Sequence, residues 1–224
     1  MKILSKLTKG YRKAAPLMFV QIISFAIVCP LFFLASCTVT KSQNSKNATA
    51  TKQAASSDAA LPGNLVQGGN FNRGDDRKWT ISNITPGVTV RFGNGKALYR
   101  GGNGGQAAIY QAIQVEANQK YQLNMRVSGH GGTDMWFEVY VGKAEPLIGQ
   151  DYNDGGKRLA LNTWNGCGKT PFNAPLTQLS CEGADRGVIQ FPTSGTVYLL
   201  IKSGGANLGI TGVTLANVEM RAIK

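Results

Sequence analysis

Short alternating runs of apolar and polar residues constrain the fold of this chain more than any other feature. They recur after residue 60, are rich in Val, Ile, Tyr and Phe, and are separated by Gly, Pro, Asn and Asp. A period of two indicates strands with one buried face, and no convincing helical period is present. The sequence therefore predicts an all-β fold, a β-sandwich, with strands at 64–71, 88–92, 107–115, 120–128, 133–141, 158–163, 187–191, 196–202 and 212–221.

The runs at 120–128 and 133–141 predict a two-faced hairpin. A one-residue slip would swap the faces of a strand, so apolar residues should pair with apolar residues. The register that does so pairs Val127 with Met135, Met125 with Phe137, Leu123 with Val139 and Tyr121 with Val141. It leaves 130–132 as a Gly-rich loop. The opposite face then gathers six residues: Gln122, Asn124, Arg126, Trp136, Glu138 and Tyr140.

This predicted patch combines two aromatic rings with amide, guanidinium and carboxylate groups. A pyranose offers an apolar face that stacks on a ring and hydroxyls that donate and accept hydrogen bonds. The patch therefore predicts a glycan site. The alternative is that a second layer or a long loop covers this face and makes Trp136 and Tyr140 part of a core. Trp164 is a further candidate, which either stacks on a sugar or plugs the end of the sandwich.

The first 36 residues have a different character. Residues 1–13 carry five Lys and Arg residues and no acidic residue, and residues 14–36 contain no charge. A positive flank before an apolar run is typical of an export signal, although 23 residues would also span a bilayer as a helix. Both interpretations place the rest of the chain outside the cytoplasm.

The apolar run stops at Leu34-Ala35-Ser36-Cys37, which resembles the lipobox of bacterial lipoprotein signal peptides. The resemblance implies that residues 1–36 are removed and that Cys37 is lipidated and anchors the chain to a membrane of the cell envelope. Thr38 replaces the Asp that favours inner-membrane retention in many Gram-negative lipoproteins, which points to the outer membrane. The alternative is an uncleaved helical anchor. Residues 38–60 contain one apolar residue larger than Ala and predict a flexible spacer.

The formal net charge of +12 lies partly in these N-terminal segments. Residues 61–224, predicted to form one domain, hold 16 Lys and Arg residues against 11 Asp and Glu residues. Their cations form no basic stripe interleaved with aromatic residues, which a face that binds nucleic acid would need. We therefore expect no nucleic-acid partner.

Two cysteines, Cys167 and Cys181, lie in a polar stretch of this domain. Because an exported protein sits where thiols oxidise, a disulfide between them is favoured over two free thiols. A metal site at this pair is disfavoured, since His130 is the only histidine in the chain.

The domain resembles the galactose-binding-like carbohydrate-binding modules, especially families 4 and 9. The resemblance lies in three segments: 64–71 followed by Trp79, 108–123, and 212–220. It implies a jelly-roll sandwich of two antiparallel sheets that binds a glycan, commonly with a structural calcium ion. The acidic residues usual in the family are replaced here by Asn70, Asn72 and Ala216-Asn217, which weakens the expectation of calcium.

We expect a binding protein rather than an enzyme. Glycoside hydrolysis needs two carboxyl groups at one site, and the predicted patch offers Glu138 alone. A polysaccharide lyase could use Tyr140 with Arg126 and Asn124, but the same residues bind sugars without chemistry. The second hypothesis is a structural lipoprotein whose sandwich docks another envelope protein, because Trp, Tyr and Arg also favour protein interfaces.

Overall fold

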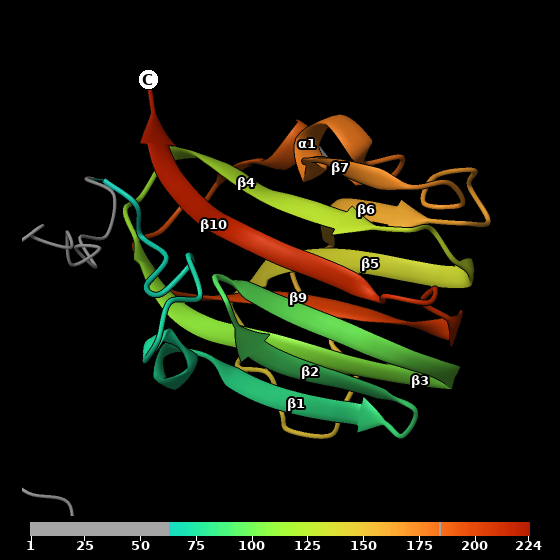
Figure 1. Cartoon of the computed structure of the whole chain (residues 1–224). Coiled ribbons are helices and arrows are strands. Elements are labelled where there is room, and N and C mark those ends of the chain that lie inside the picture. Colours follow the sequence, from blue (N-terminus) through green and yellow to red (C-terminus); the bar gives the residue numbers. More distant parts are fainter. Residues whose placement is uncertain (1–62, 184) are drawn as a thin grey trace, which may run out of the picture. The chain divides into compact units, whose positions relative to one another are not determined.

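The computed structural model describes residues 63–183 and 185–224, which form an all-β domain (Figure 1). The predicted signal peptide, Cys37 and the spacer lie outside these residues. No helix in the described part of the chain is long and apolar enough to cross a membrane. The strands are β1 (Thr80–Thr85), β2 (Val88–Gly93), β3 (Lys96–Val115), β4 (Lys120–Gly129), β5 (Thr133–Gly142), β6 (Lys157–Asn162), β7 (Phe172–Pro175), β8 (Val188–Gln190), β9 (Gly195–Asn207) and β10 (Val213–Ile223). Three short helices join them, η1 (Asp75–Lys78), α1 (Leu176–Leu179) and η2 (Asp185–Gly187).

The strands form two antiparallel sheets. Sheet A runs from β2 through the first part of β3 and β10 to β4, and the short strands β7 and β8 pair with successive parts of β4. Sheet B runs from β1 through the second part of β3, β9 and β5 to β6. The predicted jelly-roll sandwich of two antiparallel sheets is confirmed.

Strand β3 belongs to both sheets, and glycines allow it to pass between them. Its residues up to Gly101 pair with β2, and its residues from Gly102 onward pair with β9. A Cβ atom on Gly101 would lie 2.0 Å from the carbonyl oxygen of Gly87, and one on Gly105 would lie 2.5 Å from that of Pro86. Only glycine tolerates such close backbone approach, so the glycine-rich stretch marks where the strand changes sheets.

The main core lies between the two sheets and uses the apolar faces that the alternation predicts. Leu123 and Met125 of β4 and Phe137 and Val139 of β5 are buried there. Tyr99 of β3 packs edge-on against Phe137, with ring centroids 5.7 Å apart, and its hydroxyl donates to the carbonyl of Ile201. Strand parity alone therefore identified the inward side of β4 and β5.

The predicted hairpin between β4 and β5 is wrong. Strand β4 pairs with β10, β7 and β8, whereas β5 pairs with β9 and β6 (Figure 1). The chain at 130–132 crosses from sheet A to sheet B instead of closing a turn within one sheet. Two apolar faces can meet across a sandwich core as well as side by side, so matching them does not choose between the two arrangements.

The other predicted strands are mostly found, with exceptions at the ends of the domain. Residues 64–71 form a loop with a single bridge, Asn64 to Arg221, because Gly68 and Phe71 adopt positive φ. Strands β1 and β7 and the first part of β3 were not predicted. These segments are polar or rich in glycine, so they carry a weak alternating signal.

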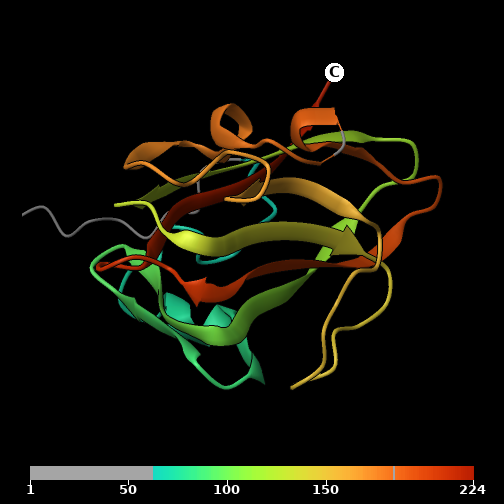
Figure 2. The ribbon, with the colours of Figure 1, turned by 90° about the vertical axis from the view of Figure 1, so that its right-hand side faces the viewer.

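A long loop, residues 143–156, covers part of the outer face of sheet B (Figure 2). The backbone N–H of Gly149 in this loop donates to the hydroxyl of Ser82 in β1, at 3.0 Å. Tyr152 of the loop is buried in a second apolar cluster with Tyr110, Tyr140 and Leu200. The part of the outer face of sheet B that this loop covers is therefore a second, smaller core.

Candidate functional site

The six residues of the predicted patch lie on two different sheets. Gln122, Asn124 and Arg126 occupy β4 of sheet A, and Trp136, Glu138 and Tyr140 occupy β5 of sheet B. In each strand the residues that alternate with these three are buried in the core. The three residues of β4 and the three of β5 therefore point outward on opposite sides of the sandwich. The structure thus does not form the patch that the sequence predicted.

On sheet B, Tyr140 is a core residue. It is 5% exposed, and its ring meets that of Tyr152 edge-on at 6.3 Å. The Tyr140 hydroxyl donates to Glu138 Oε2 at 2.9 Å. Burial, and then the charge of Glu138, raise the pKa of Tyr140 far above its ordinary value, so this hydroxyl stays a neutral donor. The alternative of a covering loop therefore holds for Tyr140.

Lys202 of β9 lies beside two aromatic rings of β5, those of Trp136 and Tyr140. Its Nζ is 4.8 Å from the centroid of Tyr140 and 5.4 Å from that of Trp136. Lys202 is 4% exposed, and its charge is balanced by Asp151 at 2.5 Å and Glu138 at 3.5 Å. The lysine thus joins β9 to β5 and to the loop that covers the sheet.

Trp136 is partly buried and lies against β9 at Gly204. A Cβ atom on Gly204 would be 2.5 Å from Cζ2 of the indole, so the ring occupies the space that a side chain would fill. Trp136 pairs with Asn162 at the end of β6, and Trp164 follows two residues later in an exposed turn. Trp164 is 61% exposed.

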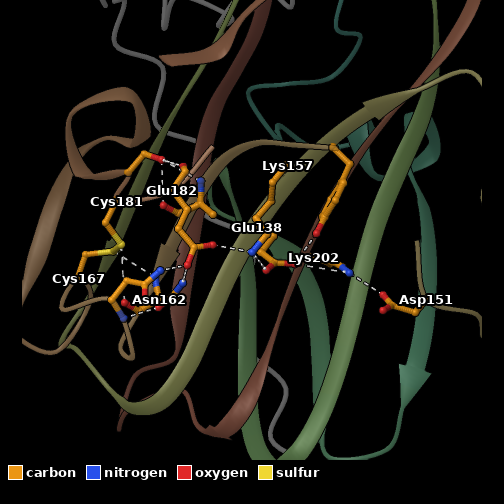
Figure 3. A network of polar contacts seen from close by, with 12 residues as sticks. Glu138, Asp151, Lys157, Asn162, Cys167, Cys181, Glu182 and Lys202 are labelled. Carbon is orange, nitrogen blue, oxygen red and sulfur yellow. Dashed lines mark hydrogen bonds and ion pairs between the residues drawn. A yellow bond between two sulfur atoms is a disulfide. The ribbon is translucent and has the colours of Figure 1, made fainter. Parts of the chain in front are cut away.

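Polar contacts continue from Glu138 across β6 to the segment that holds the disulfide (Figure 3). Lys157 Nζ lies 3.0 Å from Glu138 and 2.5 Å from Glu182, and the side chains of Asn162 and Asn165 also donate to Glu182. A hydrogen bond from Lys157 lowers the pKa of Glu182 and outweighs the effect of burial. Burial alone would lower the pKa of Lys157, but its hydrogen bonds to the two glutamates and their charges raise it.

The predicted disulfide between Cys167 and Cys181 is confirmed, with a Cα–Cα distance of 6.2 Å. It lies beside β6, since the N–H of Asn162 donates to Cys167 Sγ at 3.1 Å and the N–H of Cys181 donates to the carbonyl of Ala160. The bridge therefore closes the segment 167–181, which contains β7 and α1, and these hydrogen bonds hold its two ends beside the edge of sheet B.

Arg186 lines three adjoining cavities. Two of them lie along the outer side of β4, and the third lies between α1 and the segment 180–183. Their volumes are about 500, 700 and 300 Å³. We call this surface the Arg186 groove. The described residues that line it are Lys120, Gln122, Asn124, Arg158, Thr177, Gln178, Ser180, Cys181, Glu182, Gly183, Arg186, Val188 and Gln190.

Two predicted residues, Gln122 and Asn124, line this groove. Gln122 Nε2 donates to the carbonyl of Arg186 at 3.1 Å, and Asn124 Oδ1 accepts from the hydroxyl of Thr177 at 3.2 Å. The third, Arg126, is not among the lining residues, since its guanidinium donates to Asn173 of β7 at 2.8 and 2.9 Å. The groove is therefore built where β4 meets α1 and η2.

Most lining residues come from 177–188. The sequence places the first of these in the polar stretch that holds the two cysteines and predicts a strand at 187–191, but it predicted no site in either. The signal available for this segment was a cluster of polar side chains next to Cys181 and two glycines, Gly183 and Gly187. Both glycines have positive φ, and so does Arg186 at 50°. Glycines at these positions predict a tight turn, but they do not predict that the turn packs against β4.

The structural calcium ion that the resemblance implies would take carboxylate and carbonyl oxygens as ligands. No three His, Cys, Asp or Glu side chains gather anywhere in 63–183 and 185–224. Asp151 pairs with Lys202, and Asp154 accepts from the backbone N–H groups of Lys143 and Ala144, which makes that acidic stretch a turn rather than a metal loop.

A separate cavity of about 580 Å³ lies between the loop before β1 and strand β2, lined by Phe71, Phe92 and Arg91 among others. Phe71 stacks on Phe92 with ring centroids 5.7 Å apart, and both rings pack at the edge of the main core. This part of the cavity wall therefore belongs to the core. None of the predicted site residues lines it.

No protein-family model and no curated protein sequence matches the chain. Several solved structures align with it at low identity. The enzymatically active domain of tailspike protein 4 from bacteriophage CBA120 aligns with a TM-score of 0.47 and 18% identity, over 72% of this chain but only 22% of the tailspike chain. A family 4 carbohydrate-binding module aligns with a TM-score of 0.42 and 9% identity, over 70% of this chain and 99% of the module. TmCBM61, solved with β-1,4-galactotriose, aligns with a TM-score of 0.40 and 10% identity, over 71% of this chain and 99% of the module.

Proposed function

We propose that the β-sandwich domain is a glycan-binding module and that the Arg186 groove holds a stretch of polysaccharide chain. The observation that carries this proposal is the set of three adjoining cavities whose described lining is mainly amide, hydroxyl and guanidinium groups. Such groups donate and accept hydrogen bonds, which the hydroxyls of a sugar require. Each cavity has the size of a small-molecule site, and because the three adjoin, they suit successive sugars of one chain.

Trp164 is the aromatic ring that we assign to this site. Its neighbour Asn165 donates to Glu182, which lines one end of the groove. At 61% exposure the indole is free to stack on a sugar that leaves the groove at that end. This keeps Trp164, from the predicted set, in the glycan site, while the contacts of Trp136 and Tyr140 favour a structural role on sheet B.

We propose that the site is not catalytic. Among the described residues that line the groove, Glu182 is the one carboxylate, and its pKa is lowered. A general acid needs a raised pKa, and hydrolysis of a glycoside needs a second carboxyl group beside the first. The lyase set also fails to assemble, since Tyr140 is on sheet B whereas Asn124 and Arg126 are on sheet A. An assay for release of reducing ends or unsaturated sugars should show no turnover.

We further propose that the domain is tethered outside the cytoplasm by a lipid on Cys37. This part of the proposal rests on the lipobox-like Leu34-Ala35-Ser36-Cys37 and lies outside the described residues. Intact mass spectrometry of the protein from its native membrane should show a chain that begins at Cys37 and carries acyl groups. A chain that still begins at Met1 would instead indicate a helical anchor.

The test of the glycan site is a glycan array with residues 61–224, followed by titration calorimetry with the best ligand. Gln178 is exposed and lines two of the three cavities, so Gln178→Ala should weaken binding by about 1 kcal/mol without unfolding the domain. Trp164→Ala should weaken it by about 1–3 kcal/mol. The matched control is Gln114→Ala, an exposed position on β3 in sheet B. Unchanged affinity in both groove variants would rule out this site.

Docking of an envelope protein remains the second candidate, and one observation favours it. Leu147 and Ile148, at the tip of the loop that covers sheet B, are 61% and 69% exposed. A photoreactive residue at position 148 should then crosslink one protein partner in intact cells. Absence of any crosslink, together with glycan binding, would leave the groove as the functional surface.

A further inference from the structure

We propose that the Arg186 groove selects acidic polysaccharides, whose sugars carry carboxylate or sulfate groups. This inference rests on the proposed function, because it names the class of glycan that the same groove takes. It follows from the charges of the described lining, in which three cations face one carboxylate.

Cationic side chains line every part of the groove. Arg186 lines all three cavities, Arg158 lines the one at the Glu182 end, and Lys120 lines the one at the β8 end. Arg186 and Lys120 are exposed, so their charges are available to a ligand. A chain lying along the groove would therefore pass a cation at each end and one in the middle.

The carboxylate of Glu182 does not cancel these charges. Lys157, which is not among the lining residues, lies 2.5 Å from Glu182 and 3.0 Å from Glu138. Asn162 and Asn165 also donate to Glu182 (Figure 3). The network on sheet B sets Lys157 and Lys202 against three carboxylates, those of Glu138, Asp151 and Glu182, so it offsets the charge of Glu182 only in part. The described lining of the groove still holds three cations, Lys120, Arg158 and Arg186, against this one carboxylate.

The uncharged lining suits the rest of an acidic sugar. A guanidinium binds a carboxylate or sulfate through paired hydrogen bonds, and amides or hydroxyls beside it can bind the ring hydroxyls of the same sugar. Gln122, Gln178 and Gln190 supply such groups around Arg186. The groove therefore offers both kinds of contact that an acidic polysaccharide needs.

Other polyanions fit this lining less well. No aromatic side chain is among the described lining residues, and Trp164 at one end of the groove is a single ring, so the successive bases of a nucleic acid have no row of rings on which to stack. Its apolar lining is limited to Val188 and Cys181, which gives an acidic peptide few places for its apolar side chains. Sugars, which present a rim of hydroxyls around the ring, match the amide-rich surface better.

The test is affinity electrophoresis and calorimetry of residues 61–224 with five probes. Polygalacturonate carries carboxylates, dextran sulfate carries sulfates, and unmodified dextran and galactan are neutral. Poly-glutamate is the non-sugar polyanion. We expect tight binding to at least one acidic polysaccharide and weakening by added salt. Arg186→Gln should weaken that binding tenfold or more and change binding to neutral glycans less than twofold.

Two further variants make the result interpretable. Arg91→Gln, at an exposed arginine of β2 that lines the separate cavity, is the matched control and should change nothing. Lys120→Gln changes an exposed side chain at one end of the groove and should weaken acidic binding about threefold or more even if Arg186→Gln fails to fold.

Each outcome separates the two proposals. Preference for neutral glycans with no effect of Arg186→Gln or Lys120→Gln would overturn the acidic selectivity and leave the glycan site standing. Binding to none of the glycans would overturn the proposed function itself. Equal binding of poly-glutamate and polygalacturonate, both weakened by Arg186→Gln, would show a general polyanion site and refute selectivity for sugars.

Discussion

Removing the disulfide should destabilise the domain by an amount that follows from its loop length. Cys167 and Cys181 are 14 residues apart. Closing a loop of about 15 residues in the unfolded chain is worth about 3 kcal/mol in the chain-entropy model. For a domain of this size, a loss of that much lowers Tm by about 6–12 °C.

The native contacts of this segment should survive in the double variant Cys167→Ser/Cys181→Ser. Leu176 of α1 is fully buried, and the hydroxyl of Ser180 bonds to the carbonyl of Ala160 at 2.9 Å. These contacts keep the wall of the Arg186 groove in place once the domain is folded. Glycan affinity should therefore fall by less than about threefold, since the bridge acts mainly on the unfolded chain.

The measurement is thermal and urea unfolding of the oxidised wild type and the double variant. Dithiothreitol should lower the Tm of the wild type toward that of the variant and leave the variant unchanged. Equal Tm values for the two oxidised proteins would refute the chain-entropy reasoning. A loss of glycan binding with little loss of stability would show instead that the bridge shapes the groove directly.

Three further predictions concern the polar network and sheet B. Lys202→Met should lower the free energy of unfolding by about 2 kcal/mol, because Asp151 loses its ion pair while Glu138 still pairs with Lys157. An unchanged urea unfolding curve would contradict this. Trp136→Ala should lower the free energy of unfolding by about 2 kcal/mol and leave glycan affinity unchanged, since the indole packs on β9. Loss of glycan affinity at full stability would instead support the glycan patch predicted from the sequence. Acid should destabilise the domain through Glu182: its pKa is lower folded than unfolded, so its contribution is full above about pH 5 and is lost as pH falls through the folded pKa. Between pH 7 and pH 3, the Tm of Glu182→Gln should fall less steeply than that of the wild type. Identical slopes would argue against a stabilising contribution of the Lys157–Glu182 ion pair.

Alternation in the sequence was enough to predict the fold class and the buried face of most strands. Met135, Phe137 and Val139 were assigned to the core because they share parity, and they are buried. Parity is a local property, since it depends only on the pleat of one strand. The Cys167–Cys181 bridge was likewise predicted from the sequence, since only two cysteines lie in the domain and the chain was expected to be exported.

Only the tertiary structure decided which strands are neighbours, and with them which outward residues meet. Gln122 and Asn124 were predicted as site residues and do line the groove, but their partners are Arg186 and Thr177, more than fifty positions later. Trp136 and Tyr140, close to them in sequence, belong to the other sheet. Strand pairing depends on contacts between distant segments, which no local pattern encodes, so the sequence determined the faces of the strands while the fold determined the composition of the site.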